Sequence, residues 1–210
     1  MKQLVKDLDL KSDTDFQGRW KHIHHPNTTE WKMKVISDEI LDCKIIDGTL
    51  TILKTAVEDD FLFIDSLRKK EGRALGFIPR SNYDSILQKK RIGNRDRYKY
   101  SEIIITVDNL DNTGFCYYTY AGQDVKIQQI VIQNDARRFH RALMMLDYVE
   151  KRAKELGKTF VTARVAIDLD SNLFWKGCGY EIINTMTSTH MNRKESKSKR
   201  QLHYYSKEIN

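Results

Sequence analysis

One unit of the sequence constrains the fold more than any other part. An apolar segment at 125–133 is followed by an amphipathic segment at 136–156 and by a second apolar segment at 160–166. The apolar positions of the middle segment recur at helical spacing; they are Ala142, Leu143, Leu146, Val149, Ala153 and Leu156. Gly157 follows as a helix stop. The sequence therefore predicts a helix from about Ala136 to Leu156, and the strands on either side of it are expected to lie parallel.

Two further strands are predicted just upstream of this unit. The segments 101–108 and 115–120 are rich in β-branched and aromatic residues. Turn-forming residues lie between them at 108–114, and a second set of turn formers precedes 125–133. The three segments together predict an antiparallel meander with tight hairpins.

The remaining elements flank the meander and the helical unit. Helical spacing predicts a helix at 58–70 and a second helix that begins at Pro79. Downstream, a short helix is predicted at 171–176, and the last two strands are predicted at 180–189 and 202–206.

The first 50 residues carry the weakest pattern. Alternating apolar residues indicate a half-buried strand at 31–36, and 50–53 indicates another short strand. The chain contains no internal repeat and no clear second domain. We expect one domain of the α/β (α+β) class at 58–210, with residues 1–57 as an N-terminal extension packed on it.

The composition is that of a globular protein with an anionic partner. Hydrophobic residues make up 40% of the chain and charged residues 31%. The formal net charge is +7 and the pI is about 9.2. This charge favours a nucleic acid, a phosphorylated cofactor, or both as partners.

The cysteines and histidines predict neither disulfides nor a metal site. Cys43, Cys116 and Cys178 are scattered and form no CxxC pair. His24 and His25 lack a third ligand at a recognisable spacing. No apolar run reaches the length of a membrane-spanning helix, and the N-terminus lacks the apolar centre of a signal peptide. We expect a reduced, cytoplasmic protein without a membrane segment, and the sequence does not indicate its oligomeric state.

An unusual turn lies between the strand at 125–133 and the predicted helix. It reads Arg137, Arg138, Phe139, His140, Arg141 and Ala142. Cations are favoured at the C-terminal end of a helix, so three arginines at its start do not serve the helix. A helix start with unpaired N–H groups binds phosphates, and arginines add to that affinity. We therefore predict a polyphosphate site, with Arg137 and Arg141 on one helical face clamping one phosphate.

The order of elements, and the residues between Ile127 and Glu181, resemble the GNAT family of acetyl-coenzyme-A-dependent N-acyltransferases. The family pattern Arg/Gln-x-x-Gly-x-Gly/Ala is matched by Arg137 and Ala142, while His140 stands where the family has glycine. The stretches LGFIPRSNY and DLDSNLFWKGCGY resemble phage-encoded and mobile-element-encoded members. The resemblance implies a mixed, mostly antiparallel sheet with helices on both faces and a V-shaped split between its central strands.

The resemblance also implies acetyl-CoA, or another acyl-CoA, as co-substrate. It places the cofactor's phosphates on the turn from Arg137 to Ala142. It assigns stabilisation of the reacting carbonyl to the backbone of Ile130, Val131 and Ile132, and contact with the pantetheine arm to Asn172 and Trp175.

The proton-transfer groups of the family do not have clear counterparts. The family tyrosine that protonates the departing thiolate aligns with Trp175, and the carboxylate that serves as base aligns near Gln128 or Gln129. None of these three side chains can exchange a proton. The catalytic residues are therefore unassigned. The remaining candidates are Tyr180, His140 and Tyr120.

Three functions stay open at this stage. The first is transfer of an acetyl group to a primary amine by direct attack in a ternary complex. The second is a nucleic-acid-modifying enzyme of the Mom type, favoured by the net charge and by a basic hairpin tip; its cations are Arg193, Lys194, Lys197, Lys199 and Arg200. The third is a CoA-binding protein that has lost turnover, favoured by Trp175 and the two glutamines.

Overall fold

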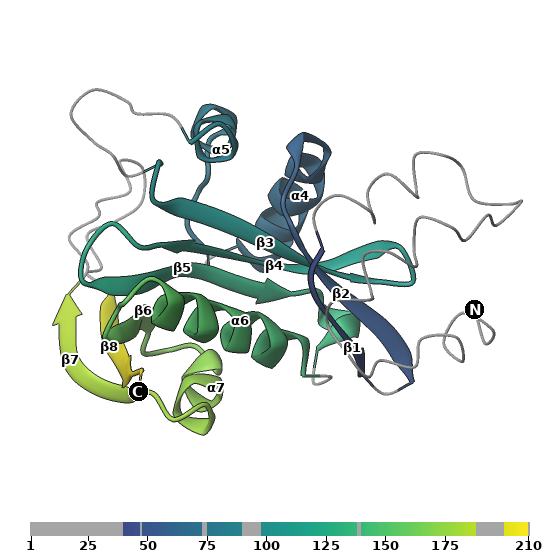
Figure 1. Cartoon of the computed structure of the whole chain (residues 1–210). Coiled ribbons are helices and arrows are strands. Elements are labelled where there is room, and N and C mark those ends of the chain that lie inside the picture. Colours follow the sequence, from purple (N-terminus) through teal and green to yellow (C-terminus); the bar gives the residue numbers. More distant parts are fainter. Residues whose placement is uncertain are drawn as a thin grey trace, which may run out of the picture.

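The computed structural model describes residues 40–46, 48–72, 75–89, 98–137, 140–187 and 200–209. In this part of the chain one sheet holds eight strands in the order β1-β2-β3-β4-β5-β6-β8-β7 (Figure 1). The strands are β1 (Ile40–Ile46), β2 (Thr49–Thr55), β3 (Ser101–Asp108), β4 (Asp111–Thr119), β5 (Asp124–Ile132), β6 (Phe160–Ala166), β7 (Glu181–Thr187) and β8 (Gln201–Glu208). The helices are α4 (Phe61–Glu71), α5 (Arg80–Leu87), α6 (Arg141–Glu155) and α7 (Ser171–Gly177), with 3-10 turns η2 (Glu58–Asp60) and η4 (Asn134–Ala136).

The sheet is mixed but mostly antiparallel, as the resemblance to the GNAT family implied. Each neighbouring pair of strands runs antiparallel except β5 and β6, which run parallel. The parallel pair is the one that the helical unit predicted, because α6 carries the chain from the end of β5 back to the start of β6.

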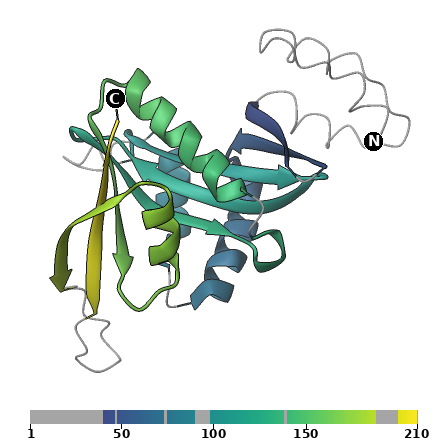
Figure 2. The same ribbon diagram turned by 90° about the horizontal axis from the view of Figure 1, so that it is seen from below.

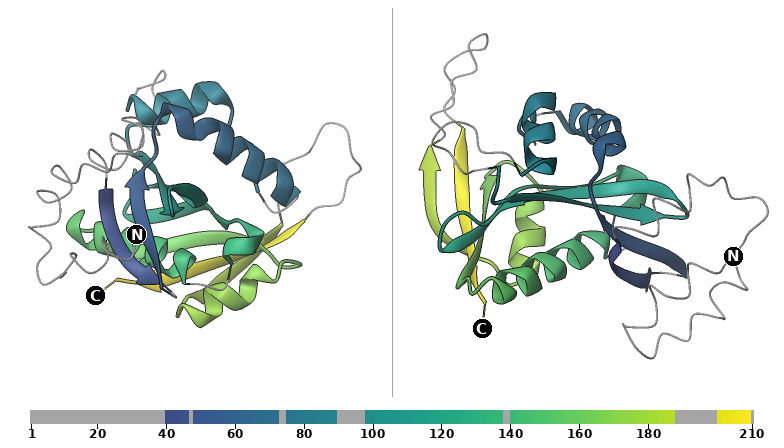
Figure 3. Two further views of the ribbon diagram at one scale, coloured as in Figure 1. Left: turned by 90° about the vertical axis from the view of Figure 1, so that its right-hand side faces the viewer. Right: turned by 45° about the horizontal axis from the view of Figure 1, so that its top comes forward.

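Helices cover both faces of the sheet (Figures 1 and 3). α4 and α5 pack on one face over a core that includes Ile105 and Phe115. α6 and α7 pack on the other face over a core that includes Cys116, Val125 and Met145. Figure 2 shows α6 lying across the central strands. Side chains alternate between the faces along each strand, and because both faces are covered, β3 and β4 bury side chains at nearly every position.

The β3–β4 hairpin is tighter than the sequence predicted. A turn through 108–114 was expected, whereas β4 begins at Asp111 and the turn consists of Asn109 and Leu110. Both residues have positive φ, 48° and 78°, which is the backbone that matches the twist of a two-residue hairpin. Gly114 lies inside β4 because a Cβ there would come within 2.6 Å of the carbonyl oxygen of Val131.

The described part of the expected N-terminal extension belongs to the sheet. β1 had no sequence signal, yet it pairs with β2, and β2 pairs with β3 over Thr51–Thr55. The predicted strand at 31–36 and the histidine pair at 24–25 lie outside the described residues. So does most of the basic tip, of which Arg200 alone is described.

Candidate active site

β5 and β6 separate part of the way along their length. Their parallel pairing covers four residue pairs and ends at Ile127 and Ala163. A register shift in the β4–β5 ladder, between Tyr117 and Tyr118, leaves Gln128 as an extra residue at this point. Such bulges re-aim a strand and are common beside active sites. Beyond the bulge β5 continues to Ile132 with β4 as its partner, so its other edge opens into a V-shaped split.

The backbone groups on this open edge follow from the ladder. The N–H of Gln133 donates to the carbonyl of Thr113 on the β4 side at 2.8 Å. Since backbone groups alternate between the two edges of a strand, Val131 also faces β4, while Ile130 and Ile132 face the split. The Nε of Arg137 donates to the carbonyl oxygen of Ile132 at 3.0 Å, in agreement with this direction. The split therefore presents the amide groups of Ile130 and Ile132.

The start of α6 lies at the same end of β5. The sequence predicted a helix from about Ala136, but residues 134–136 form a 3-10 turn and α6 begins at Arg141. His140 is the N-cap, with φ 58° and ψ 3°, and its side chain makes no capping hydrogen bond. Glycine adopts this left-handed backbone freely, so the glycine of the GNAT pattern would fit at position 140 without strain. The first intrahelical bond runs from Met144 N–H to His140, so the N–H groups of the first turn have no acceptor within the helix.

Arg137 and Arg141 do not share a helical face, so the predicted i, i+4 clamp is wrong in its geometry. Arg137 precedes the helix, and its guanidinium forms an ion pair with Glu71 at the end of α4. Arg141 is 7% exposed, and its guanidinium lies between the carboxylate of Asp108 and the carbonyl oxygen of Ala136. Arg138 and Phe139 lie outside the described residues. Ala142 is the second residue of α6 and half-buried.

Asn172 and Trp175 have structural contacts. The Nδ2 of Asn172 donates to the carbonyl oxygens of Ala166 at 2.9 Å and Leu169 at 2.6 Å, which ties the β6–α7 loop together. Trp175 is 3% exposed and packs edge-to-face on Tyr180, with ring centroids 5.0 Å apart. Their predicted contact with a pantetheine arm is not tested by these contacts and stays a prediction.

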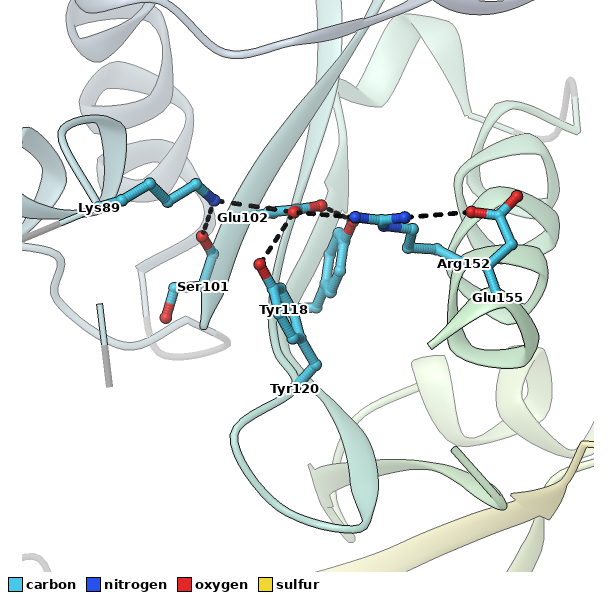
Figure 4. A network of polar contacts seen from close by, with 7 residues as sticks. All are labelled: Lys89, Ser101, Glu102, Tyr118, Tyr120, Arg152 and Glu155. Atoms are coloured by element: carbon cyan, nitrogen blue, oxygen red, sulfur yellow. Dashed lines mark hydrogen bonds and ion pairs between the residues drawn. The ribbon is translucent and has the colours of Figure 1, made fainter. Parts of the chain in front are cut away.

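Two of the catalytic candidates are held by carboxylates. The hydroxyl of Tyr180 donates to Glu150 of α6 at 3.0 Å, and burial raises the pKa of this phenol. The hydroxyl of Tyr120 donates to Glu102 at 3.1 Å, and burial together with the Glu102 charge raises its pKa to about 12. Figure 4 shows Tyr120 beside Tyr118 and Glu102. Tyr118 pairs with Ile127, where β5 and β6 are still paired, so these residues lie at the closed end of the V rather than in the split. His140 is exposed at the start of α6.

A cavity of about 750 Å³ adjoins the β5–α6 loop on the side of β2 and the β3–β4 hairpin. Its wall contains the ion pair of Lys54 with Asp60, at 2.7 Å, and the pair of Arg141 with Asp108. Asp59, Asp111 and Asp135 add further carboxylates. Sequence reasoning missed Glu71 and Asp108 as partners of the two arginines, because neither residue carried a local signal for such a contact.

Several solved structures share the fold of this chain. An N-acetyltransferase from Staphylococcus aureus superposes with a TM-score of 0.60 and 14% identity, over 76% of this chain and 99% of the other. NAA60 from Arabidopsis thaliana, in complex with a bisubstrate analogue, gives a TM-score of 0.63 and 9% identity, over 76% and 98%. A Desulfovibrio desulfuricans protein assigned to the GNAT family gives 0.60 and 11%, over 76% and 99%. This chain has the GNAT fold.

The likeness rests on structure alone. No protein-family model matches the sequence, and no curated protein matches it. In the GNAT fold seen here, the split between β5 and β6 lies along the part of β5 that leads to the start of α6. In the described residues, no helix is long and apolar enough to cross a membrane.

Proposed function

We propose that the chain transfers an acyl group, in the first place acetyl, from acyl-CoA to a primary amine. The observation that carries the proposal is the separation of β5 from β6 directly beside the uncapped start of α6. A helix start, whose first-turn N–H groups have no acceptor within the helix, suits a pyrophosphate. The open edge of β5 suits an extended arm that carries the thioester. The GNAT fold supports the same assignment.

The residues of the site would act through their backbone. The amide of Ile130 faces the split and would donate to the acyl oxygen as negative charge develops on it. The first-turn amides of α6, at Ala142 and Leu143, would hold the pyrophosphate, with Arg137 and His140 beside them. Acyl-CoA supplies the thioester whose C–S bond breaks as the bond between the amine nitrogen and the acyl carbon forms.

The amine would attack directly, without an acyl-enzyme. Cys116 is fully buried, and burial raises the pKa of its thiol, so it offers no thiolate. Gln128 and Gln129, on the separated part of β5, cannot accept a proton. We therefore propose that the amine arrives deprotonated and that, after attack, one of its two N–H protons passes to solvent, while the departing thiolate takes a proton from solvent.

Thiol release from acetyl-CoA, measured on a panel of primary amines, tests this proposal. The sharpest variant is Ile130→Pro, because it deletes the amide that faces the split and leaves the β4 ladder intact. We expect its turnover to fall about 100-fold or more, with acetyl-CoA still bound. Val131→Pro is the matched control, because it removes a ladder amide and should destabilise the fold instead. Turnover in Ile130→Pro equal to wild type would exclude this role for the amide.

A nucleic-acid-modifying enzyme is the second candidate, favoured by the net charge of +7. Retention of duplex or single-stranded DNA that weakens steeply with salt would support it. Binding of acetyl-CoA without thiol release on any amine or nucleic acid would instead support a protein that binds CoA without turnover.

A further inference from the structure

The guanidinium of Arg141 bonds back to the main chain that precedes its own helix. Arg141 is the first residue of α6, and its Nη1 donates to the carbonyl oxygen of Ala136, five residues earlier, at 3.2 Å. The segment between these two residues includes the left-handed His140. The side chain of Arg141 therefore links the start of α6 to the end of the 3-10 turn η4.

Asp108 ties the start of α6 to the sheet. Its Oδ2 accepts from Nε of Arg141, and its Oδ1 accepts from the hydroxyl of Thr51 at 2.6 Å. Thr51 and Asp108 are register partners on β2 and β3, and all three side chains are buried. A chain of buried polar contacts thus runs from β2 through β3 to the start of α6.

Neither helix formation nor stability explains this pair. A cation in the first turn of a helix is unfavourable. Burying two charges costs desolvation energy that their attraction does not always offset. Apolar residues of similar size at the same positions often give a folded state of equal or greater stability. The pair instead fixes the position of the first turn of α6 relative to β3.

We propose that Arg141 and Asp108 are positioning residues for the cofactor site. They hold the start of α6 against β3 and the carbonyl oxygen of Ala136, in the position in which the first-turn amides at Ala142 and Leu143 receive the pyrophosphate. Arg141 thus serves the site by position, because its guanidinium anchors the first turn of α6. This inference rests on the proposed function.

The double variant Asp108→Leu/Arg141→Met separates positioning from stability, because it removes both charges together. We expect its melting temperature to stay close to wild type, and its Kd for acetyl-CoA to rise about tenfold or more as the first-turn amides of α6 lose their alignment. The KM for acetyl-CoA should rise in parallel, with kcat at saturating acetyl-CoA largely retained. Equal Kd values for the variant and wild type would overturn the inference.

Arg141→Lys provides a second measurement should the double variant not fold. Lysine can pair with Asp108 but lacks the planar fork that reaches Asp108 and Ala136 together. A raised Kd in this variant supports the inference, and an unchanged Kd overturns it. The matched control is Lys54→Met/Asp60→Leu. It removes a similarly buried pair, in which Asp60 bonds to Lys54, Val57 and Asn112 rather than to Arg141, and it should leave Kd unchanged. If wild type itself binds no acetyl-CoA, the proposed function fails as well, and the two failures are distinguishable.

Discussion

The residue that departs most clearly from the GNAT pattern is His140, and the structure gives it a backbone that side chains disfavour. Its φ of 58° lies in the left-handed region, where a residue with a Cβ is strained by roughly 1 kcal/mol or more. The imidazole is exposed and does not cap the helix. Two effects are therefore combined at this position: the strain of the backbone and the bulk of a ring beside the first-turn amides.

His140→Gly and His140→Ala separate these effects. We expect glycine to raise the free energy of unfolding by about 0.5–1 kcal/mol, because relief of the strain exceeds the added entropy of the unfolded chain. Alanine keeps the strain and should not stabilise. If the ring narrows the phosphate site, both variants will bind acetyl-CoA more tightly than wild type. Urea unfolding and calorimetric titration measure the two quantities, and a glycine variant less stable than the alanine variant would contradict the reading of strain.

At the scale of elements, Glu102 joins strands and helices at the closed end of the V (Figure 4). Its carboxylate on β3 accepts from the hydroxyls of Tyr118 and Tyr120 on or next to β4. Lys89, just after α5, and Arg152 of α6 lie 3.7 and 4.0 Å from the same carboxylate. One half-buried acid thus connects α6 and the residue after α5 to β3 and β4, at the end opposite the split.

This network predicts a loss of stability at alkaline pH. Burial and the Glu102 charge raise the pKa of Tyr120 to about 12, whereas an unfolded chain has a tyrosine pKa of about 10. The neutral phenol therefore stabilises the fold below about pH 10, and that contribution is lost as the pH rises from about 10 to about 12. Tyr120→Phe, which lacks the phenol, should show a shallower decline. Urea unfolding of both proteins between about pH 8 and 11 measures the slopes, and parallel slopes would contradict the assignment.

At the scale of the whole molecule, the split divides the sheet into two parts. β1 to β5 form one part and β6, β8 and β7 the other, and the pairs from Asp124–Phe160 to Ile127–Ala163 join them together with α6. A ligand in the split would contact both parts and so stabilise the molecule as a unit. A ligand that lacks the pyrophosphate would miss the start of α6.

Acetyl-CoA should therefore raise the melting temperature. At about 100 times its Kd a ligand stabilises the folded state by roughly 2.7 kcal/mol, which for a chain of this size corresponds to about 5–10 °C. Acetyl-pantetheine, which carries the thioester but no pyrophosphate, is the matched control and should shift the melting temperature far less. Equal shifts from both ligands at equal concentration would place the main contacts away from the start of α6.

The sequence by itself determined the elements whose signal is local. Helical spacing within 136–156, and the apolar segments before and after it, predicted α6 between the parallel strands β5 and β6, because side-chain periodicity reports which face of an element is buried. The short helix at 171–176 and the meander followed from the same kind of signal. β1, without such a pattern, was missed.

Only the tertiary structure decided where the arginines point and where the helix begins. Glu71 is 66 residues from Arg137 in sequence, and Asp108 is 33 residues from Arg141. A guanidinium binds whichever carboxylate the fold brings within reach, and sequence spacing within the turn from Arg137 to Ala142 carries no information about that partner. The sequence therefore predicts a polyphosphate site at this turn, whereas only the fold shows that the guanidiniums of Arg137 and Arg141 are paired with carboxylates.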